Sequence, residues 1–157
     1  MNKEASELNN LLIDAYERVS DMEQHMLIGL EHTDVTISEL HIMEYIGVAK
    51  EQGRTISDIA VKFSKTPPSI TVAIKKLESR GYVEKLKSSK DGRIVRVVLT
   101  REGRRVDAAH RYFHRNMGNE LLKHMDGEDR TALLKGLNIL IDFFNQTIEN
   151  FDNKSKI

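Results

Sequence analysis

The stretch from Thr66 to Leu99 constrains the fold most, because it joins a short amphipathic helix to a charged β-hairpin. Thr66 is a favourable N-cap residue, and Pro67 suits the first helical position, where its missing N–H costs nothing. Gly81 supplies a stop at the C-terminal end. The apolar residues in between recur at helical spacing and form one stripe: Ile70, Ile74 and Leu77. This pattern predicts a helix over residues 66–80.

The opposite face of this predicted helix carries small, hydroxyl-bearing and basic side chains, which are the groups that contact base edges and phosphates. It holds no acidic residue before Glu78. A face that is merely solvated more often alternates Glu with Lys, so the composition favours DNA contact. The candidate DNA-binding residues on this helix and in the turn before it are Ser64, Lys65, Thr66, Pro68, Ser69, Thr71, Val72, Lys75 and Lys76.

A β-hairpin is predicted over residues 82–99. In its second strand Val95, Val97 and Leu99 alternate with Arg96 and Val98, which is the period of a half-buried strand. Asp91-Gly92 is a turn signal, and the polar tip contributes two further candidate DNA contacts, Ser88 and Lys90.

A shorter helix precedes this unit. Thr55 to Asp58 can form its N-cap region, and its inward residues would be Ile56, Ile59, Ala60 and Phe63. Helix, turn, helix, glycine, strand, basic tip and strand follow one another in the order of a winged helix-turn-helix. The segment therefore predicts a DNA-binding module.

The charge distribution supports this prediction, although the whole chain has 24 basic and 24 acidic residues. Residues 1–61 carry 4 basic and 12 acidic side chains, residues 62–115 carry 15 and 5, and residues 116–157 carry 5 and 7. The basic excess coincides with the predicted helix, wing and following helix, as expected for phosphate contacts.

The composition bounds the remaining possibilities. A chain of 157 residues suits one domain, and the absence of Cys excludes disulfides and thiolate metal sites. There is no long apolar run, and the first residues lack the apolar region of a signal peptide. We therefore expect a cytoplasmic protein without membrane contact. No nucleophile elbow, P-loop or dinucleotide-binding loop is found, so an enzyme is not expected.

The flanking segments predict helices over residues 8–30, 38–49, 100–124 and from 126 onwards. The last has a broad apolar face made by Leu133, Leu137, Leu140, Phe144, Ile148 and Phe151, widened by Leu134 and Ile141. A second subunit would cover such a face, although packing on its own domain is the alternative. A two-fold dimer would also place two recognition helices in successive major grooves of a palindromic operator.

Residues 55–103 resemble the MarR family of bacterial regulators. The resemblance is carried by Asp91-Gly92-Arg93, by Leu99-Thr100 after five intervening residues, and by the junction Leu77–Val83. It implies a mainly α fold with a small β-wing, in which helices at 1–35 and 100–157 form a homodimer around a winged helix-turn-helix at 36–99. It also implies that Arg93 enters the minor groove and that Asp91 orients the wing. Many members have a second Arg where this chain has Gly92, which would remove one phosphate contact.

Three further segments, at 37–43, 110–117 and 136–144, resemble the branch of that family that represses fatty acid synthesis. This implies long-chain acyl carrier protein as co-repressor. An acyl tail needs an apolar channel, for which the candidate residues are Leu27, Ile28, Leu30, Ile42, Tyr45, Ile46, Phe113 and Met117. These residues can equally be ordinary core. Basic side chains at Arg104, Arg105, Arg111 and Arg115 are candidate docking points for an acidic carrier, or for DNA.

The histidines favour an alternative effector, zinc. His110 and His114 are four residues apart and share a helix face, and His41 lies on another predicted helix. Zinc-responsive MarR regulators use a comparable pair of helices. Against a metal site, no acidic residue stands beside His110 on its own helix, and unpaired helical histidines are more often structural. A regulator that responds to another small ligand also remains possible.

Overall fold

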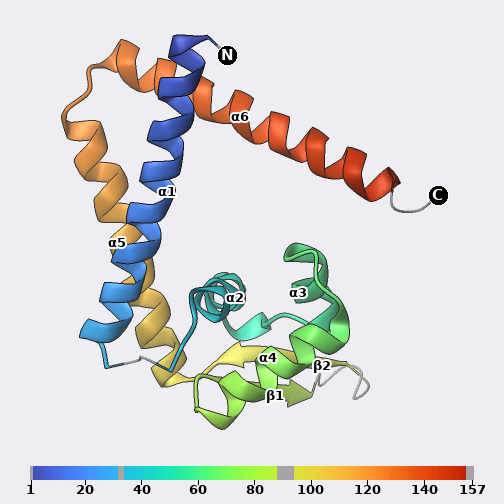
Figure 1. The fold of residues 1–157 in the computed structure, drawn as a ribbon. Helices are drawn as coiled ribbons and strands as arrows, with labels where there is room; N and C mark the ends of the chain where they lie inside the picture. Colours follow the sequence, from blue (N-terminus) through green and yellow to red (C-terminus); the bar gives the residue numbers. More distant parts are fainter. Residues whose placement is uncertain (1, 32–33, 88–93, 155–157) are drawn as a thin grey trace. The chain divides into compact units, whose positions relative to one another are not determined.

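The computed structural model describes residues 2–31, 34–87 and 94–154 (Figure 1). Over these residues the chain is mainly α-helical, with one two-stranded antiparallel sheet, which confirms the predicted fold class. In chain order the elements are α1 (Lys3–Gly29), α2 (Ile37–Val48), the 3-10 helix η1 (Lys50–Gln52), α3 (Ile56–Lys62), α4 (Pro67–Ser79), β1 (Val83–Lys87), β2 (Val95–Leu99), α5 (Arg101–Lys123) and α6 (Gly127–Lys154).

The chain divides into two compact units, Met1–Phe113 and His114–Ile157. The first unit contains α1 to α4, the sheet and the first part of α5, and the second contains the end of α5 and α6. The predicted assignment of residues 36–99 to a module between dimerisation helices stays a prediction.

The two helices of the helix-turn-helix begin at the predicted caps. Thr55 and Asp58 form a capping box at the start of α3, in which each backbone N–H donates to the other side chain at 2.9 and 3.1 Å. These hydrogen bonds hold the pKa of the Asp58 carboxyl below its usual value. At the start of α4, the Thr66 hydroxyl accepts from the backbone N–H of Ser69 at 3.4 Å. The cap of each helix therefore lies where the sequence predicted it.

The wing strands pair in antiparallel register, with Val83 opposite Leu99 at the base. The predicted alternation along β2 is only partly correct, because Val98 is buried and Val95 is 38% exposed. Both faces of the strand are covered at its base. Arg54 extends the sheet by bridging to Val97, and Gly53 beside it lets the chain approach so closely that a Cβ would lie 2.8 Å from a methyl carbon of Val98.

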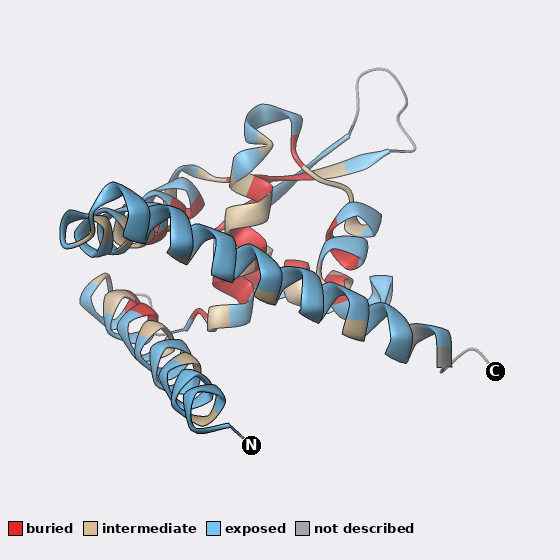
Figure 2. Cartoon of the chain, turned by 90° about the horizontal axis from the view of Figure 1, so that it is seen from above, coloured by how far each residue is buried: buried red, intermediate tan, exposed pale blue. Residues whose placement is uncertain are grey.

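A hydrophobic core joins α2, α3, α4 and the sheet. The apolar stripe predicted for α4 is fully buried, as are Leu40, Met43 and Ile46 of α2. In Figure 2 the buried residues, in red, gather in this part of the chain. Because the core fixes the inner face of α4, its outer face is held toward solvent.

The long helices bury much less within one chain. In α1 the buried side chains are Glu23 and Leu27, whereas Leu8 and Met22 of the predicted apolar stripe are more than half exposed. In the second unit, Figure 2 shows α6 exposed along most of its length. Its exposed apolar residues include Leu134, Leu137, Ile141, Phe144, Ile148 and Phe151. No helix among the described residues is long and apolar enough to cross a bilayer.

Candidate nucleic-acid interface and neighbouring clusters

The outer face of α4 carries the candidate DNA contacts. All of the predicted residues on α4 and the preceding turn are exposed except Thr71, which is partly buried and donates its hydroxyl proton to the Pro67 carbonyl. Val72 is 55% exposed, so its methyl groups are available to a thymine methyl. Lys75 and Lys76 form no ion pair with any other described residue. This face offers apolar, hydroxyl and cationic groups to one partner.

A polar junction holds the end of α4 against the start of α2. Arg80, the C-cap of α4, donates to Glu39 Oε2 at 3.1 Å and lies 3.5 Å from Asp34. The same Glu39 oxygen accepts from the Thr36 backbone N–H at 3.0 Å, as part of the α2 capping box. Tyr82 adds a hydrogen bond from its hydroxyl to Asp34, and burial together with this bond raises the pKa of Tyr82 to about 12. The junction fixes the orientation of the recognition helix.

A hollow of about 260 Å³ lies beside the exposed face, between α2 and α4. Its wall includes two cations, Lys65 and Lys76, and two hydroxyl residues, Thr36 and Ser69. Ile42, one of the candidate effector residues, also lines it. Cations and hydroxyls around a concave surface are suited to a phosphate group.

The predicted contacts at the wing tip, Ser88, Lys90, Asp91 and Arg93, lie outside the described residues. The strands that lead to the tip are described, and Lys85 and Lys87 on β1 are exposed. Lys85 pairs with Glu78, so Lys87 is the more available cation of the two.

The predicted effector residues differ in their burial within the described parts of the chain. Leu27, Ile42 and Ile46 are buried in the hydrophobic core, and Tyr45 packs against it. Ile28 is 52% exposed. Leu30 and Phe113 are half-buried, and Met117, at 41% exposure, belongs to the second unit. Of the two described cavities, neither is lined by these residues apart from Ile42. Their role in binding an acyl chain stays a prediction.

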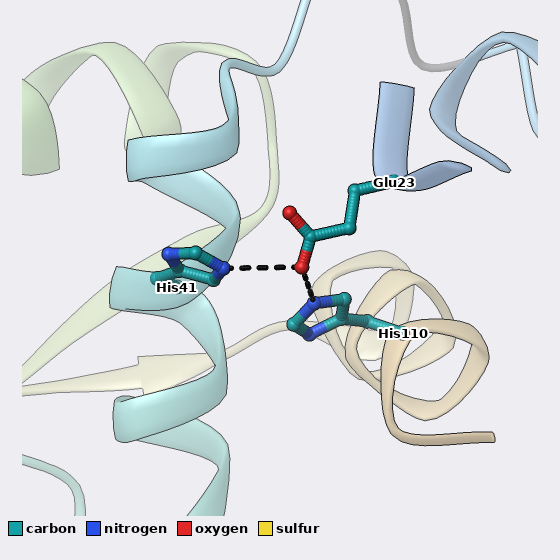
Figure 3. Close-up of side chains that lie close together, drawn as sticks. All are labelled: Glu23, His41 and His110. Carbon is teal, nitrogen blue, oxygen red and sulfur yellow. Dashed lines mark hydrogen bonds and ion pairs between the residues drawn. The ribbon is translucent and has the colours of Figure 1, made fainter. Parts of the chain in front are cut away.

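A buried polar cluster joins α1, α2 and α5 (Figure 3). Glu23 of α1 directs one carboxylate oxygen, Oε1, toward His41 of α2 and His110 of α5, at 3.2 and 3.0 Å from their Nε2 atoms. Glu23 and His110 are almost completely buried, and His41 is partly exposed. The other ring nitrogen of His110 lies 3.4 Å from Glu44. Such a group of ligand atoms within 4.8 Å of one another is of the kind that holds a metal ion.

Two members of the predicted zinc set, His41 and His110, lie together in this cluster, and Glu23 is its third member. His114 belongs to the second unit, so its part in a metal site stays a prediction. The acidic member of the cluster is supplied by α1, 87 residues away from His110 in sequence. The sequence signal for this member was the position of Glu23, which directly follows Met22 of the predicted apolar stripe.

A second cavity, with a volume of about 830 Å³, lies elsewhere. The end of α2, both wing strands and the first half of α5 form its walls, and its apolar lining includes Val48, Leu86, Val98 and Leu99. Lys50, Arg104 and Arg111 supply cations, and Glu51, Glu84 and Asp107 supply acids.

Asp107 is the buried charged group of this cavity, with 1% of its surface exposed. Arg111 Nη2 approaches Oδ2 to 2.8 Å, but neither carboxylate oxygen has a hydrogen-bond partner among the described residues. Burial raises the pKa of Asp107 to about 6, against the lowering effect of Arg111. Gly47 makes room for this side chain, because a Cβ there would collide with the carboxyl group. Asp107 is not among the site residues predicted from the sequence.

The MarR family model matches residues 33–94, which contain α2 to α4 and strand β1 and end just before β2. The chain resembles the MarR family over these residues. It is thus a DNA-binding transcription regulator, and the prediction that it is not an enzyme is confirmed. The exposed face of α4 and its junction with α2 are the described part of a MarR winged helix-turn-helix.

Solved structures of MarR-like proteins resemble the chain over almost its whole length. FabT of Streptococcus pneumoniae, solved in complex with DNA, is 29% identical, with a TM-score of 0.83 over 90% of this chain and 98% of its own. The regulator BldR of Sulfolobus solfataricus is also 29% identical, with a TM-score of 0.59 over 90% and 99%. MepR of S. aureus, solved with DNA, shares the fold at 21% identity, with a TM-score of 0.63 over 83% and 94%. No curated protein is a match for the chain.

Proposed function

We propose that this MarR-family regulator is a homodimeric repressor of fatty acid synthesis genes, with acyl carrier protein bearing a long acyl chain as co-repressor. The observation that carries the DNA-binding part is the exposed α4 face, which is held by the Arg80–Glu39 junction. Likeness to FabT supports the fatty acid part, since that structure is 29% identical over 90% of this chain. The segments at 37–43, 110–117 and 136–144 add to this support through their resemblance to the fatty acid branch of the family.

The exposed apolar surfaces support a dimer. Leu137, Phe144 and Ile148 on α6 are 41 to 53% exposed within a single chain. Contiguous apolar surface of this kind marks a protein interface. A second copy would bury it and would pair two recognition helices for a two-fold operator.

Charge supports an acidic carrier as partner. Arg104, Arg105, Arg111 and Arg115 on α5 are exposed, and Arg105 pairs only weakly with Glu102 at 3.4 Å. Exposed cations on one helix would steer an acidic protein toward the regulator.

The test is a DNA-binding titration on an operator duplex selected from random sequences with the protein itself. Fluorescence anisotropy would compare acylated carrier protein, unacylated carrier protein and no addition at fixed salt. The proposal predicts tighter binding with the acylated carrier alone. Equal effects of both carrier forms, or no effect of either, would contradict the co-repressor role while leaving DNA binding intact.

A second candidate effector, zinc, is favoured by the Glu23–His41–His110 cluster. In a tetrahedral zinc site with bonds of about 2.0 to 2.1 Å, neighbouring ligand atoms lie about 3.3 Å apart. The measured distances from Glu23 Oε1 to the two imidazole nitrogens are 3.2 and 3.0 Å, so a small adjustment would admit the ion. The ion would join α1, α2 and α5 and would fix the helix-turn-helix against the long helices.

Zinc binding can be measured by competition with a chromophoric chelator. Wild-type protein should retain zinc, and His110→Ala and Glu23→Gln should each lose it, whereas His124→Ala, at an exposed histidine outside the cluster, should not. Equal zinc retention by all four proteins would exclude the cluster as the site.

A further inference from the structure

We propose that the 830 Å³ cavity between the wing and α5 binds an amphipathic effector, whose apolar body packs on Val98 and Leu86 and whose N–H group donates a hydrogen bond to Asp107. The inference concerns a cavity distinct from the Glu23 cluster, and it does not depend on which effector the proposed function names.

Volume and lining give the first argument. A cavity of this size matches those that hold drug-sized ligands. Four aliphatic side chains line it, including Val48 from α2 and Leu99 from the base of the wing. Val48 and Leu86 are exposed, so an apolar ligand body would remove these two side chains from water, which is favourable. The cavity therefore suits a ligand with a saturated or flat apolar part.

Asp107 gives the second, independent argument. Its carboxyl group is buried; Arg111 forms an ion pair with Oδ2, but neither oxygen accepts a well-directed hydrogen bond from a described residue. A buried polar group without a hydrogen bond is unfavourable, so a ligand that supplies a donor gains the energy that the protein alone forgoes. The carboxylate would repel a second carboxylate, which selects against simple fatty acids at this position.

The other charged groups of the wall balance one another. Arg111 is paired with Asp107, and Arg104 donates to the Leu99 carbonyl oxygen at 2.7 Å. The lining also contains one further cation, Lys50, and two further acids, Glu51 and Glu84. The cavity is thus close to neutral, so the N–H donor can belong to an ammonium group or to a neutral amide, including the amides of a pantetheine arm.

The position of the cavity connects it to DNA binding. Leu86 and Val98 lie on the two strands of the wing, and Arg104 and Asp107 lie on α5. The base of the wing is tied to α5, because Thr100 N–H donates to the Tyr82 carbonyl oxygen and Arg104 to that of Leu99. A ligand between these elements would bias the direction of the wing, which is how an effector changes affinity at a separate surface.

The experiment uses isothermal titration calorimetry with four probes that share an eight-carbon chain: octylamine, octanamide, octanoate and octanol. We expect octylamine, octanamide or both to bind about tenfold more tightly than octanoate, as expected for a hydrogen bond to a charged acceptor. Asp107→Asn should remove that preference. Tighter binding of octylamine would identify the donor as cationic, and tighter binding of octanamide would identify it as neutral. Octanoate that binds as tightly as octylamine and octanamide would overturn the proposal.

A substitution that fills the cavity is the second test of the proposal. Ala108 is exposed and lines the cavity, so Ala108→Trp would fill the space without entering the hydrophobic core. Binding of the N–H probes should be lost in this variant and kept in Val61→Trp, a matched change at a residue that is 81% exposed and outside the lining. Retained binding in a folded Ala108→Trp protein would show that the probes bind elsewhere.

Discussion

Arg80 donates a hydrogen bond to Glu39 at 3.1 Å, and this ion pair joins the end of the recognition helix to the start of α2. The Glu39 side chain is 9% exposed and also accepts from the backbone at Thr36, so it is held from two sides. The recognition helix is therefore positioned by a polar contact in addition to its apolar stripe.

Loss of this contact should lower stability. Arg80→Ala is expected to reduce the free energy of unfolding by about 1 to 3 kcal/mol, because a nearly buried carboxylate loses a charged donor. Urea denaturation measures the change. Arg18→Ala is the matched control, since Arg18 lies 4.0 Å from Asp21 in an exposed pair that should contribute about 1 kcal/mol or less. If the two variants unfold alike, the junction has no special role.

The lysines of α4 should carry part of the salt dependence of DNA binding. Lys75→Ala and Lys76→Ala should each reduce the slope of log affinity against log salt by about one unit, if each contacts a phosphate. Lys3→Ala, at an exposed lysine in the first turn of α1, is the control with an unchanged slope. A slope equal to that of the wild type in all three variants would leave α4 as a solvated surface.

The α6 face should control assembly. Leu140→Glu with Phe144→Glu is expected to give a monomer or an unfolded chain, because two unpaired charges would enter the proposed subunit interface. Sedimentation velocity distinguishes these states from a dimer. Gln146→Glu adds one charge at an exposed polar position of the same helix and should leave the dimer intact. A dimer that survives the double substitution would locate the interface elsewhere.

Stability should depend on pH through Asp107. Its pKa is raised to about 6 in the folded chain, from about 4 in the unfolded chain, so the folded state holds a proton that the unfolded state releases between these values. Stability due to this group therefore falls as pH rises from about 4 to about 6, by at most about 3 kcal/mol. Urea denaturation of wild type and Asp107→Asn across this range isolates the effect, because Arg111 and Glu44 are common to both. Parallel pH profiles would show that Asp107 keeps its ordinary pKa.

The local features were predictable from the sequence, whereas the buried polar groups were not. The cap at Thr66 and the buried Ile70 depend on residues within a few positions of one another, so their pattern is visible in one segment. Glu23 contacts His110 across 87 residues, and its partner cannot be read from helix periodicity. Asp107 shares the buried face of α5 with Val106, but a charged side chain is ordinarily expected at the surface.

Burial of Val98 shows the same limit for the wing. A period of two assigns it to the exposed face of a two-stranded ribbon, but Gly53 and the neighbouring bridge at Arg54 cover that face at the base. Val98 is covered by Gly53, which lies 45 residues earlier in the sequence, so this burial is visible only in the tertiary structure.

Mapping of the DNA sites that the protein occupies in its own cells, by immunoprecipitation of crosslinked DNA, tests the proposed function most directly. The account predicts bound sites with two-fold sequence symmetry upstream of fatty acid synthesis genes, and loss of these sites when Lys75 and Lys76 are both replaced by Ala. Occupancy confined to promoters of metal-uptake genes, with none at lipid genes, would contradict it and would favour zinc at Glu23, His41 and His110 as the effector.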